Sequence, residues 1–378
     1  MPRLTVCQLL PELEVGGVEQ GTLEIAAALV AAGHRALVIS GGGRLVPQLE
    51  ALGATHIPLP IGRKRLGALR LVGPLREIFR RERVDLVHAR SRLPAWLGWF
   101  ARRGLPEAEQ PRWVTTVHGP YTVNRYSRIM VSGEAVIAIS GFIRDYIFRA
   151  YPGAVAPTAV HLIPRGVDRG RYPGGFTPDA AWLATWQQAE PALAGRVPLV
   201  LPGRLTRWKG QEDFLELLAR LLAAGLPVHG LLAGGAHPRK RAFEDELRAR
   251  ATRLGIGERL SFLGQRSDLR EVMAVSACAF SLTGEPEAFG RTTIEALSLG
   301  VPVIGYDHGG TGEILREVFP AGLVPPGDIE AAAARCAAFL AQRPVVPAAH
   351  PFTTERLQAS TLAVYETLCA SRGRPQWA

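Results

Sequence analysis

The sequence has no long hydrophobic run. Although 47% of its 378 residues are hydrophobic, no stretch approaches the roughly 18 consecutive apolar residues that span a bilayer. Residues 1–10 are too few and too strand-like for a secretory signal peptide. We therefore expect a cytoplasmic protein, with enough residues for two domains that each bury a core of their own.

Cysteine is also scarce. The four cysteines lie far apart in the chain and match no metal-binding or redox spacing. We interpret them as small buried residues of a protein in a reducing compartment. The sequence predicts neither a zinc site nor a dithiol redox site.

Acidic residues are depleted in one segment. Residues 63–128 contain 15 Lys/Arg against five acids, and the rest of the chain contains 29 of each sign, so this segment carries the whole net charge of +10. Such a basic face suits an anionic membrane surface, an acidic acceptor or nucleic acid. Trp96, Trp99 and Phe100 lie next to Arg102 and Arg103, which is typical of an interfacial helix rather than of a base-stacking platform. We expect peripheral contact with the inner face of the membrane; the alternative is a solvated arginine-rich surface.

The chain alternates between strand-like and helix-like segments. In the first half, strands are predicted at 4–10, 36–40, 55–59, 85–88, 113–117 and 135–140. Helices are predicted from after residue 20 to about 32 and at 45–52, 66–83, 94–103 and 141–150. The second half shows the same alternation. This pattern predicts βαβ units and mostly parallel sheets in an α/β fold.

One stretch in the second half carries the strongest functional signal. Glu287 follows an apolar strand at 277–282, Gly290 is at the turn, and Glu295 is in the first turns of a helix at 292–299. Ligands of open α/β sheets bind beyond the carboxyl ends of the strands. The amides at a helix start suit phosphate, and a carboxylate accepts hydrogen bonds from a diol. The pattern predicts a ligand in which phosphate is flanked by hydroxyl-rich groups, and a nucleotide sugar fits this description.

Glu287 and Glu295, with Phe289 and Gly290 between them, also resemble the donor-site motif of retaining GT-B glycosyltransferases of family 4. The resemblance implies that Glu295 holds the donor ribose and Glu287 contacts the hexose hydroxyls. It implies two Rossmann-like domains with parallel sheets facing an interdomain cleft. We expect an acceptor domain at 1–170, a linker at 171–195, a nucleotide-sugar domain at 196–352, and a helix at 353–378 that crosses back to the first domain.

A second motif supplies positive charge. Arg204 leaves a strand, and Lys209 precedes a helix at 213–224, so two cations and a helix N-terminus converge on one anion site. This spacing resembles the family's pyrophosphate clamp. No Asp-x-Asp occurs in the chain, so we expect no metal and no permanently bound cofactor. Arg204 and Lys209, helped by backbone near Gly290, Arg291 and Thr292, are then expected to bind the diphosphate of a UDP- or GDP-sugar.

In the first half, a glycine pair and a histidine resemble the family, and an arginine departs from it. Gly16 and Gly17 follow the first strand, where the family has a Gly-Gly loop that closes over the donor. His118 leaves the strand at 113–117 and corresponds to a histidine near the transferred sugar. Arg165 stands where the family usually has asparagine; the added charge suits an acidic acceptor.

The residues and the resemblance together therefore predict a glycosyltransferase with His118, Arg204, Lys209 and Glu287 at its reacting centre. Retention of the anomeric configuration is implied by the resemblance alone. Its acceptor would be a hydroxyl of a glycan or glycolipid, in bacterial envelope polysaccharide or lipopolysaccharide core synthesis. A non-transferring GT-B enzyme, such as a nucleotide-sugar epimerase, is one alternative. A basic membrane- or nucleic-acid-binding protein is another, although nucleic acid would leave the cleft motifs unused. A dinucleotide-dependent oxidoreductase is disfavoured because Gly-x-Gly-x-x-Gly does not follow the first strand.

Overall fold

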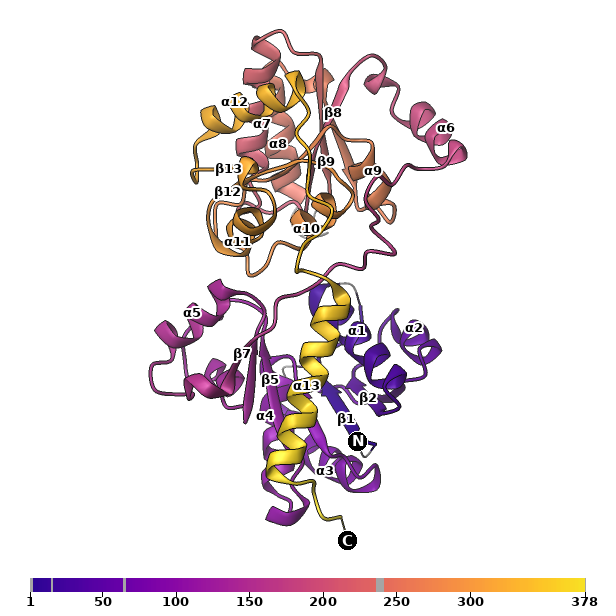
Figure 1. Cartoon of the computed structure of the whole chain (residues 1–378), viewed down its shortest axis with the longest axis vertical. Coiled ribbons are helices and arrows are strands. Elements are labelled where there is room, and N and C mark those ends of the chain that lie inside the picture. Colours follow the sequence, from indigo (N-terminus) through magenta and orange to yellow (C-terminus); the bar gives the residue numbers. More distant parts are fainter. Residues whose placement is uncertain (1–2, 15, 64–65, 236–240, 378) are drawn as a thin grey trace. The chain divides into compact units, whose positions relative to one another are not determined.

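The computed structural model describes residues 3–14, 16–63, 66–235 and 241–377. The chain divides into two compact units (Figure 1). Unit 1 comprises Met1–Arg165 and Thr354–Ala378, and unit 2 comprises Gly166–Thr353. Among the described residues, no helix combines the length and apolar character needed to cross a membrane.

Unit 1 is built on a seven-stranded parallel sheet in the order β3-β2-β1-β4-β5-β6-β7. Its strands are β1 (Thr5–Leu9), β2 (Arg35–Ser40), β3 (Thr55–Pro58), β4 (Leu86–Ala89), β5 (Arg112–Val117), β6 (Ala135–Ala138) and β7 (Val160–Leu162). Its α-helices are α1 (Gly17–Ala31), α2 (Val46–Ala51), α3 (Val72–Arg81), α4 (Arg92–Arg103), α5 (Gly141–Ala150) and α13 (Thr354–Arg372).

Unit 2 contains a six-stranded parallel sheet in the order β10-β9-β8-β11-β12-β13. Its strands are β8 (Val197–Pro202), β9 (Val228–Ala233), β10 (Leu260–Gly264), β11 (Cys278–Ser281), β12 (Val303–Tyr306) and β13 (Leu323–Val324). Its α-helices are α6 (Ala180–Ala189), α7 (Gln211–Ala223), α8 (Arg241–Arg253), α9 (Leu269–Ala274), α10 (Arg291–Ser298), α11 (Gly309–Val318) and α12 (Ile329–Ala341). The predicted α/β class with two parallel sheets is confirmed.

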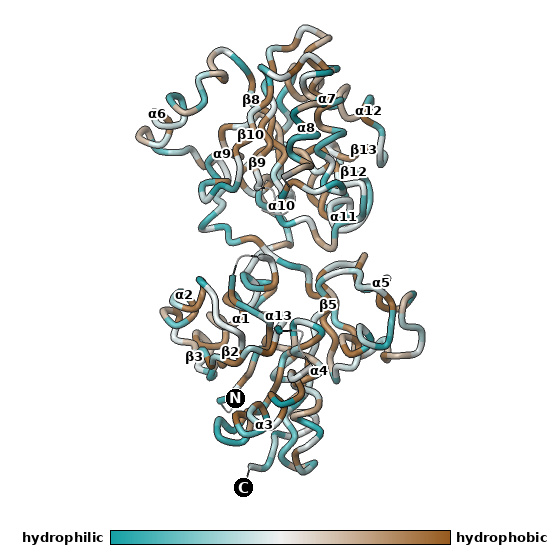
Figure 2. Tube along the Cα trace, turned by 180° about the vertical axis from the view of Figure 1, so that it is seen from behind, coloured by the Kyte–Doolittle hydropathy of each residue, from teal (hydrophilic) through white to brown (hydrophobic). Residues whose placement is uncertain are grey.

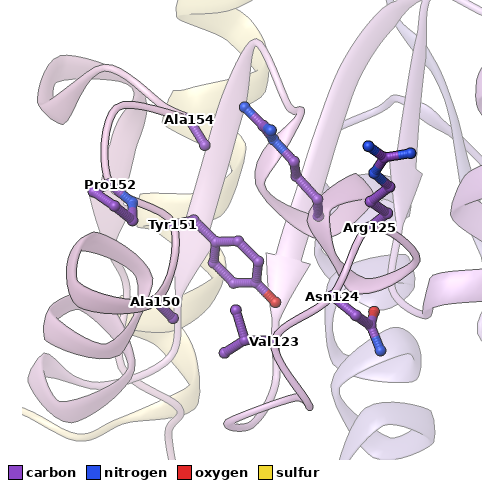
Figure 3. Close-up of a pocket in the computed structure, with 8 residues that line it drawn as sticks. Val123, Asn124, Arg125, Ala150, Tyr151, Pro152 and Ala154 are labelled. Carbon is purple, nitrogen blue, oxygen red and sulfur yellow. The ribbon is translucent and has the colours of Figure 1, made fainter.

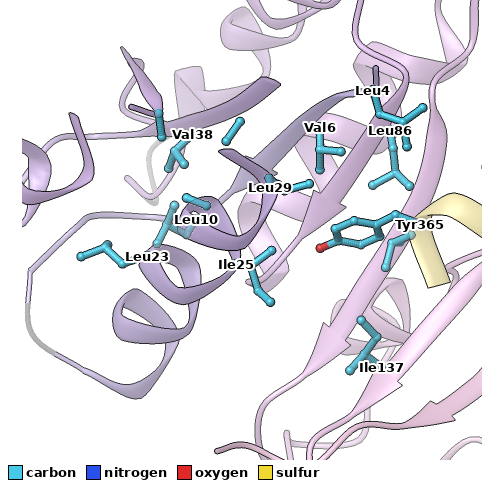
Figure 4. Packing of buried hydrophobic residues seen from close by; sticks show 14 of the residues in the cluster. Leu4, Val6, Leu10, Leu23, Ile25, Leu29, Val38, Leu86, Ile137 and Tyr365 are labelled. Atoms are coloured by element: carbon cyan, nitrogen blue, oxygen red, sulfur yellow. The ribbon is translucent and has the colours of Figure 1, made fainter. Parts of the chain in front are cut away.

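The strands are hydrophobic because both faces of each sheet are covered by helices. Figure 2 shows hydrophobic residues concentrated on the strands inside each unit. In unit 1, α13 packs against α1, and its Tyr365 is fully buried among residues of the central strands, including Leu86 and Ile137 (Figure 4). The last helix of the chain is therefore part of the core of unit 1.

Two segments differ from their sequence-based expectation. The helix expected over 66–83 begins as a 3₁₀ helix (Leu66–Leu71), and α3 starts only at Val72, because Pro74 fits only the first turn of an α-helix. The expected linker at 171–195 lies in unit 2 and contains α6. Trp182 fixes that helix by donating its indole N–H to Asp268 over 2.8 Å.

Candidate active site

The residues predicted for the donor lie at one edge of the unit 2 sheet. The strand order reverses between β8 and β11, since β9 and β10 extend from one side of β8, and β12 and β13 from the other side of β11. A crevice forms beyond the carboxyl ends of the strands at such a switch point. Arg204 and Lys209 follow β8, and Glu287 to Glu295 follow β11. The neighbouring strands therefore bring two distant parts of the sequence together.

Backbone contacts hold the Lys209 loop against the β11 loop. Gly210 has a φ of 75°, and a Cβ there would lie 1.8 Å from the carbonyl oxygen of Leu282, so only glycine fits this approach. The amide of Gly284 donates to the carbonyl of Trp208 over 2.8 Å. The ammonium group of Lys209 consequently forms an ion pair with the carboxylate of Glu287.

Lys209 has an unusual electrostatic environment. Burial and the nearby charge of Arg204 lower the pKa of Lys209 to about 8. The Nζ atom also lies 4.5 Å from the centre of the Trp208 ring, where the ring's electrons attract a cation. Two cations are thus held close together, and one of them is compensated by Glu287.

The Glu287 loop packs directly on the first turn of α11. The amide of Gly310 donates to the carbonyl of Glu287 over 2.7 Å. A Cβ on Gly310 would lie 2.3 Å from the Cα of Phe289. Gly290, the residue that starts α10, has a φ of 93° and lies against Thr311. The glycines allow this close packing and leave the start of α10 at the carboxyl edge of the sheet.

Arg291, Thr292 and Glu295 occupy the first turns of α10. The guanidinium of Arg291 donates to the carboxylate of Glu295 over 3.3 Å, and Glu295 is 9% exposed. Tyr172 lies within electrostatic reach of both: burial, followed by the charge of Glu295, raises its pKa to about 12. Phe289 is buried and packs edge-on against Phe352, with ring centres 5.8 Å apart.

In unit 1, a comparable edge carries the remaining predicted residues. The strand order reverses between β1 and β4. Gly16 and Gly17 stand at the start of α1 just after β1, and His118 directly follows β5. Arg165 donates one N–H to the carbonyl of Gly17 and another to Nδ1 of His118, the latter over 2.9 Å. The structure thus brings Gly17, His118 and Arg165 together.

The contact with Arg165 fixes the state of His118. A guanidinium only donates hydrogen bonds, so Nδ1 of His118 accepts, and the proton of the neutral ring is on Nε2. Burial, followed by the charges of Arg165, Arg90 and His88, holds the pKa of His118 well below its usual range. His118 is therefore a neutral hydrogen-bond donor at neutral pH. The Nε2 atom is inaccessible to solvent and has no hydrogen-bond partner among the described residues.

Sequence reasoning missed two polar residues at these edges. Arg90 directly follows β4, is 5% exposed, and donates to the side chain of Gln8 over 2.6 Å. Gln211 is fully buried and donates to the carbonyl of Arg204 over 3.0 Å, which fixes that backbone. The signal for Arg90 was available, because a charged residue at the end of a buried strand indicates a site. Gln211 occupies the first position of an amphipathic helix, and the sequence contains no signal that indicates its role.

The basic segment at 63–128 is only partly free to meet a partner. Arg90 is buried, Arg80 pairs with Glu109, and Arg102 and Arg112 both pair with Glu134. Lys64 and Arg65 lie outside the described residues.

Arg125 and Arg128 remain exposed and line a hollow of about 240 Å³ (Figure 3). The Tyr151 ring lies in the middle of that hollow, with Asn124 and Arg125 on one side and Ala150 and Pro152 on the other. The hollow combines an aromatic ring with cationic and amide groups, which are the groups that bind sugars and anions.

Comparisons with known proteins agree with this arrangement. The family model Glycosyltransferase Family 4 matches residues 15–171, and the model Glycosyl transferases group 1 matches residues 186–352. The lipopolysaccharide core biosynthesis mannosyltransferase LpsB of Rhizobium meliloti is 28% identical over 249 residues. That match covers 62% of this chain and 66% of the relative, so about a third of the relative is unmatched.

Solved structures extend the likeness to the whole fold. A glycosyltransferase from Rickettsia africae superposes with a TM-score of 0.85 at 26% identity, covering 97% of this chain and 99% of that one. Anabaena HepE, solved in complex with UDP-glucose, gives a TM-score of 0.76 at 22% identity, covering 98% and 99%. With both family models matched in tandem and a GT-B architecture, this chain belongs to the family 4 glycosyltransferases.

Proposed function

We propose that the protein transfers a hexose-type sugar from a UDP- or GDP-sugar to a hydroxyl of a glycan or glycolipid. The observation that carries the proposal is the Lys209–Glu287 ion pair next to Arg204 at the β8–β11 switch point. A diphosphate would take up the positive charge of Lys209 and Arg204, and Glu287 would accept hydrogen bonds from sugar hydroxyls. The complex of Anabaena HepE with UDP-glucose supports a donor of this class.

Breaking the bond between sugar and phosphate leaves negative charge on the departing nucleotide. Arg204, Lys209 and the first amides of α10 would stabilise that charge. Each preorganised donor of this kind contributes about 3 kcal/mol to the transition state. These cations take the role that a metal has in other transferases, so we propose a metal-independent reaction.

We also propose retention of the anomeric configuration, with the acceptor hydroxyl attacking from the face of the leaving group. His118, held neutral by burial and by Arg165, would lie next to the transferred sugar. Glu295 would accept hydrogen bonds from the donor ribose, while Arg291 orients its carboxylate. Gly16, Gly17, Phe289, Gly290 and Thr292 would shape the surface that meets the donor.

A donor screen tests this function. A panel of UDP- and GDP-sugars is assayed for release of UDP or GDP and for thermal stabilisation of the protein. One donor should be cleaved slowly by water, and Lys209→Ala should lose this activity. Arg220→Ala, which removes an exposed charge on α7, should retain it. Failure of every donor to bind or react would refute the proposal.

A nucleotide-sugar epimerase is distinguished by the product. Transfer to an added acceptor forms a new glycosidic bond, whereas epimerisation returns a sugar of altered configuration without one. The relation to a lipopolysaccharide core mannosyltransferase favours transfer in envelope synthesis. Mass spectrometry of products formed with bacterial envelope extracts decides between the two reactions.

We further propose that unit 1 contacts anionic membrane through the end of α4. Trp96, Trp99 and Phe100 form a cluster with ring centres 5.3–6.0 Å apart, Phe100 is 39% exposed, and Arg103 lies over Trp99. Aromatic rings next to exposed arginine suit the headgroup region. Phe100→Ala should weaken sedimentation with vesicles that contain phosphatidylglycerol at least fivefold. Val345→Ala, which truncates a 90% exposed valine of unit 2, is the control; equal sedimentation of both variants would refute this contact.

A further inference from the structure

A small cavity in unit 1 lies near the carboxyl ends of β4, β5 and β6, next to helices α1 and α13 and on the β4 side of the β1–β4 switch point. Its polar lining includes Arg90, His118 and Arg165, and its apolar lining includes Ile137 and Ile163. Its space is about 20 Å³, enough for one water-sized group. The described residues that line it include two arginines and no carboxylate.

The hydrogen-bonding groups of this cavity that have no partner among the described residues are donors. Nε2 of His118 carries the ring proton because Nδ1 accepts from Arg165. Both this Nε2 and the Nε–H of Arg90 are buried and have no hydrogen-bond partner among the described residues. The hydroxyl of Thr116 is already engaged with His88. Buried donors without an acceptor are costly, so the cavity is suited to an acceptor-only group.

Gly21 allows the two guanidinium groups to approach each other. A Cβ at this position would lie 2.8 Å from Nη1 of Arg165 and 3.0 Å from Nη2 of Arg90. The positive charges of Arg90 and Arg165 are therefore held close together over α1, next to the apolar residues that line the cavity. Glu24 and Glu19 act on Arg90 from α1, but neither lines the cavity. An anion placed here would relieve the repulsion between the two arginines.

We propose that the Arg90–Arg165–His118 cavity binds the carboxylate of an acidic sugar in the acceptor. The inference deepens the proposed function and rests on it, and on the expectation that the domain at residues 1–170 binds the acceptor. The small volume favours a planar carboxylate, which inserts one oxygen, over a tetrahedral phosphate. The sugar ring would remain outside, and the carboxylate would fix its orientation.

Direct binding of a probe tests the proposal. Calorimetry at constant ionic strength compares D-glucuronate with D-glucose and inorganic phosphate, using the full chain without donor. Glucuronate should bind at least tenfold more tightly than glucose. Arg165→Asn should remove this preference, and Arg165→Lys should retain part of it. Arg149→Gln, which removes an exposed charge on α5, should leave it unchanged.

Measurements with nucleotide separate this proposal from the function of unit 2. UDP and GDP affinities should be the same in the wild-type protein and in Arg165→Asn; a tenfold loss would assign the guanidinium to the donor and overturn the proposal. Equal binding of glucuronate and glucose, equal glucuronate binding by Arg165→Asn, or a preference for phosphate would also overturn it. Circular dichroism verifies that the variants are folded. If glucuronate binds but no nucleotide does, the donor function fails while the carboxylate site stands.

Discussion

The two units share a parallel α/β architecture but differ in the charge arrangement at their switch points. In unit 2, Glu287 pairs with Lys209 and Glu295 with Arg291, so carboxylates lie next to the cations. In unit 1, the polar lining of the cavity consists of two arginines, two histidines that burial keeps neutral and two threonines, with no carboxylate among the described residues that line it. Mixed charge suits a ligand with both phosphate and hydroxyl groups, whereas donors alone suit an anion. The same sheet topology therefore supports two candidate sites of different chemistry in the two units.

The largest effect is expected when one of the two cationic residues of the unit 2 site, Lys209 or Arg204, is removed. Lys209→Ala and Arg204→Ala should each lower turnover at least a hundredfold, because each removes a charge that stabilises the leaving diphosphate. Steady-state kinetics with the donor found in the screen measures the effect, and Arg220→Ala serves as the charge-matched control. Turnover close to wild type in either variant would remove that residue from the proposed mechanism.

The proposed role of the Glu295 carboxylate is tested by measuring nucleotide affinity. Glu295→Gln should weaken UDP or GDP binding about tenfold to a hundredfold, since hydrogen bonds to charged groups contribute about 1.5–3 kcal/mol. Calorimetry measures the change, and Glu317→Gln removes an exposed carboxylate from α11 as a control. Unchanged nucleotide affinity would show that the ribose is held elsewhere.

The pH dependence of kcat/KM for the nucleotide-sugar donor tests the proposed role of Lys209. Because its pKa is lowered to about 8, the ammonium form that attracts the diphosphate is lost as the pH rises through that value. The kcat/KM for the donor should fall about tenfold per pH unit above pH 8. Lys209→Arg should move this decline to higher pH. A wild-type profile that stays flat to pH 10 would contradict the assignment.

The smallest effect concerns the stability of unit 1 in acid. Burial holds the pKa of His88 well below its usual 6.5, so the unfolded chain binds the proton more readily. The stabilisation is present above pH 6.5 and is lost as the pH falls below it, at up to about 1.4 kcal/mol per pH unit. Urea denaturation between pH 7.5 and 5.5 should show a flatter dependence for His88→Gln than for the wild type. Tyr365→Phe, which removes only the hydroxyl bonded to His88, should keep the wild-type slope.

Local pattern was enough to predict most elements and the positions of several candidate site residues at strand ends and helix starts. Arg204, Lys209 and Glu287 all follow buried strands, and strand ends are recognisable from apolar runs that stop at glycine or polar residues. The pattern did not predict the helix α6 within residues 171–195, where Pro, Gly and Ala suggested a linker. There, Trp182 of α6 donates a hydrogen bond to Asp268, 86 residues away in sequence.

By itself, the sequence determined the α/β alternation, the two parallel sheets and the turns that carry the charged residues, because these follow from short-range periodicity and from glycine and proline. Only the tertiary structure decided which of those residues meet. The order of the strands places Lys209 next to Glu287 and puts Arg90, His118 and Arg165 around one cavity. Strand order is set by how helices and strands distant in sequence pack together, and no local pattern encodes it.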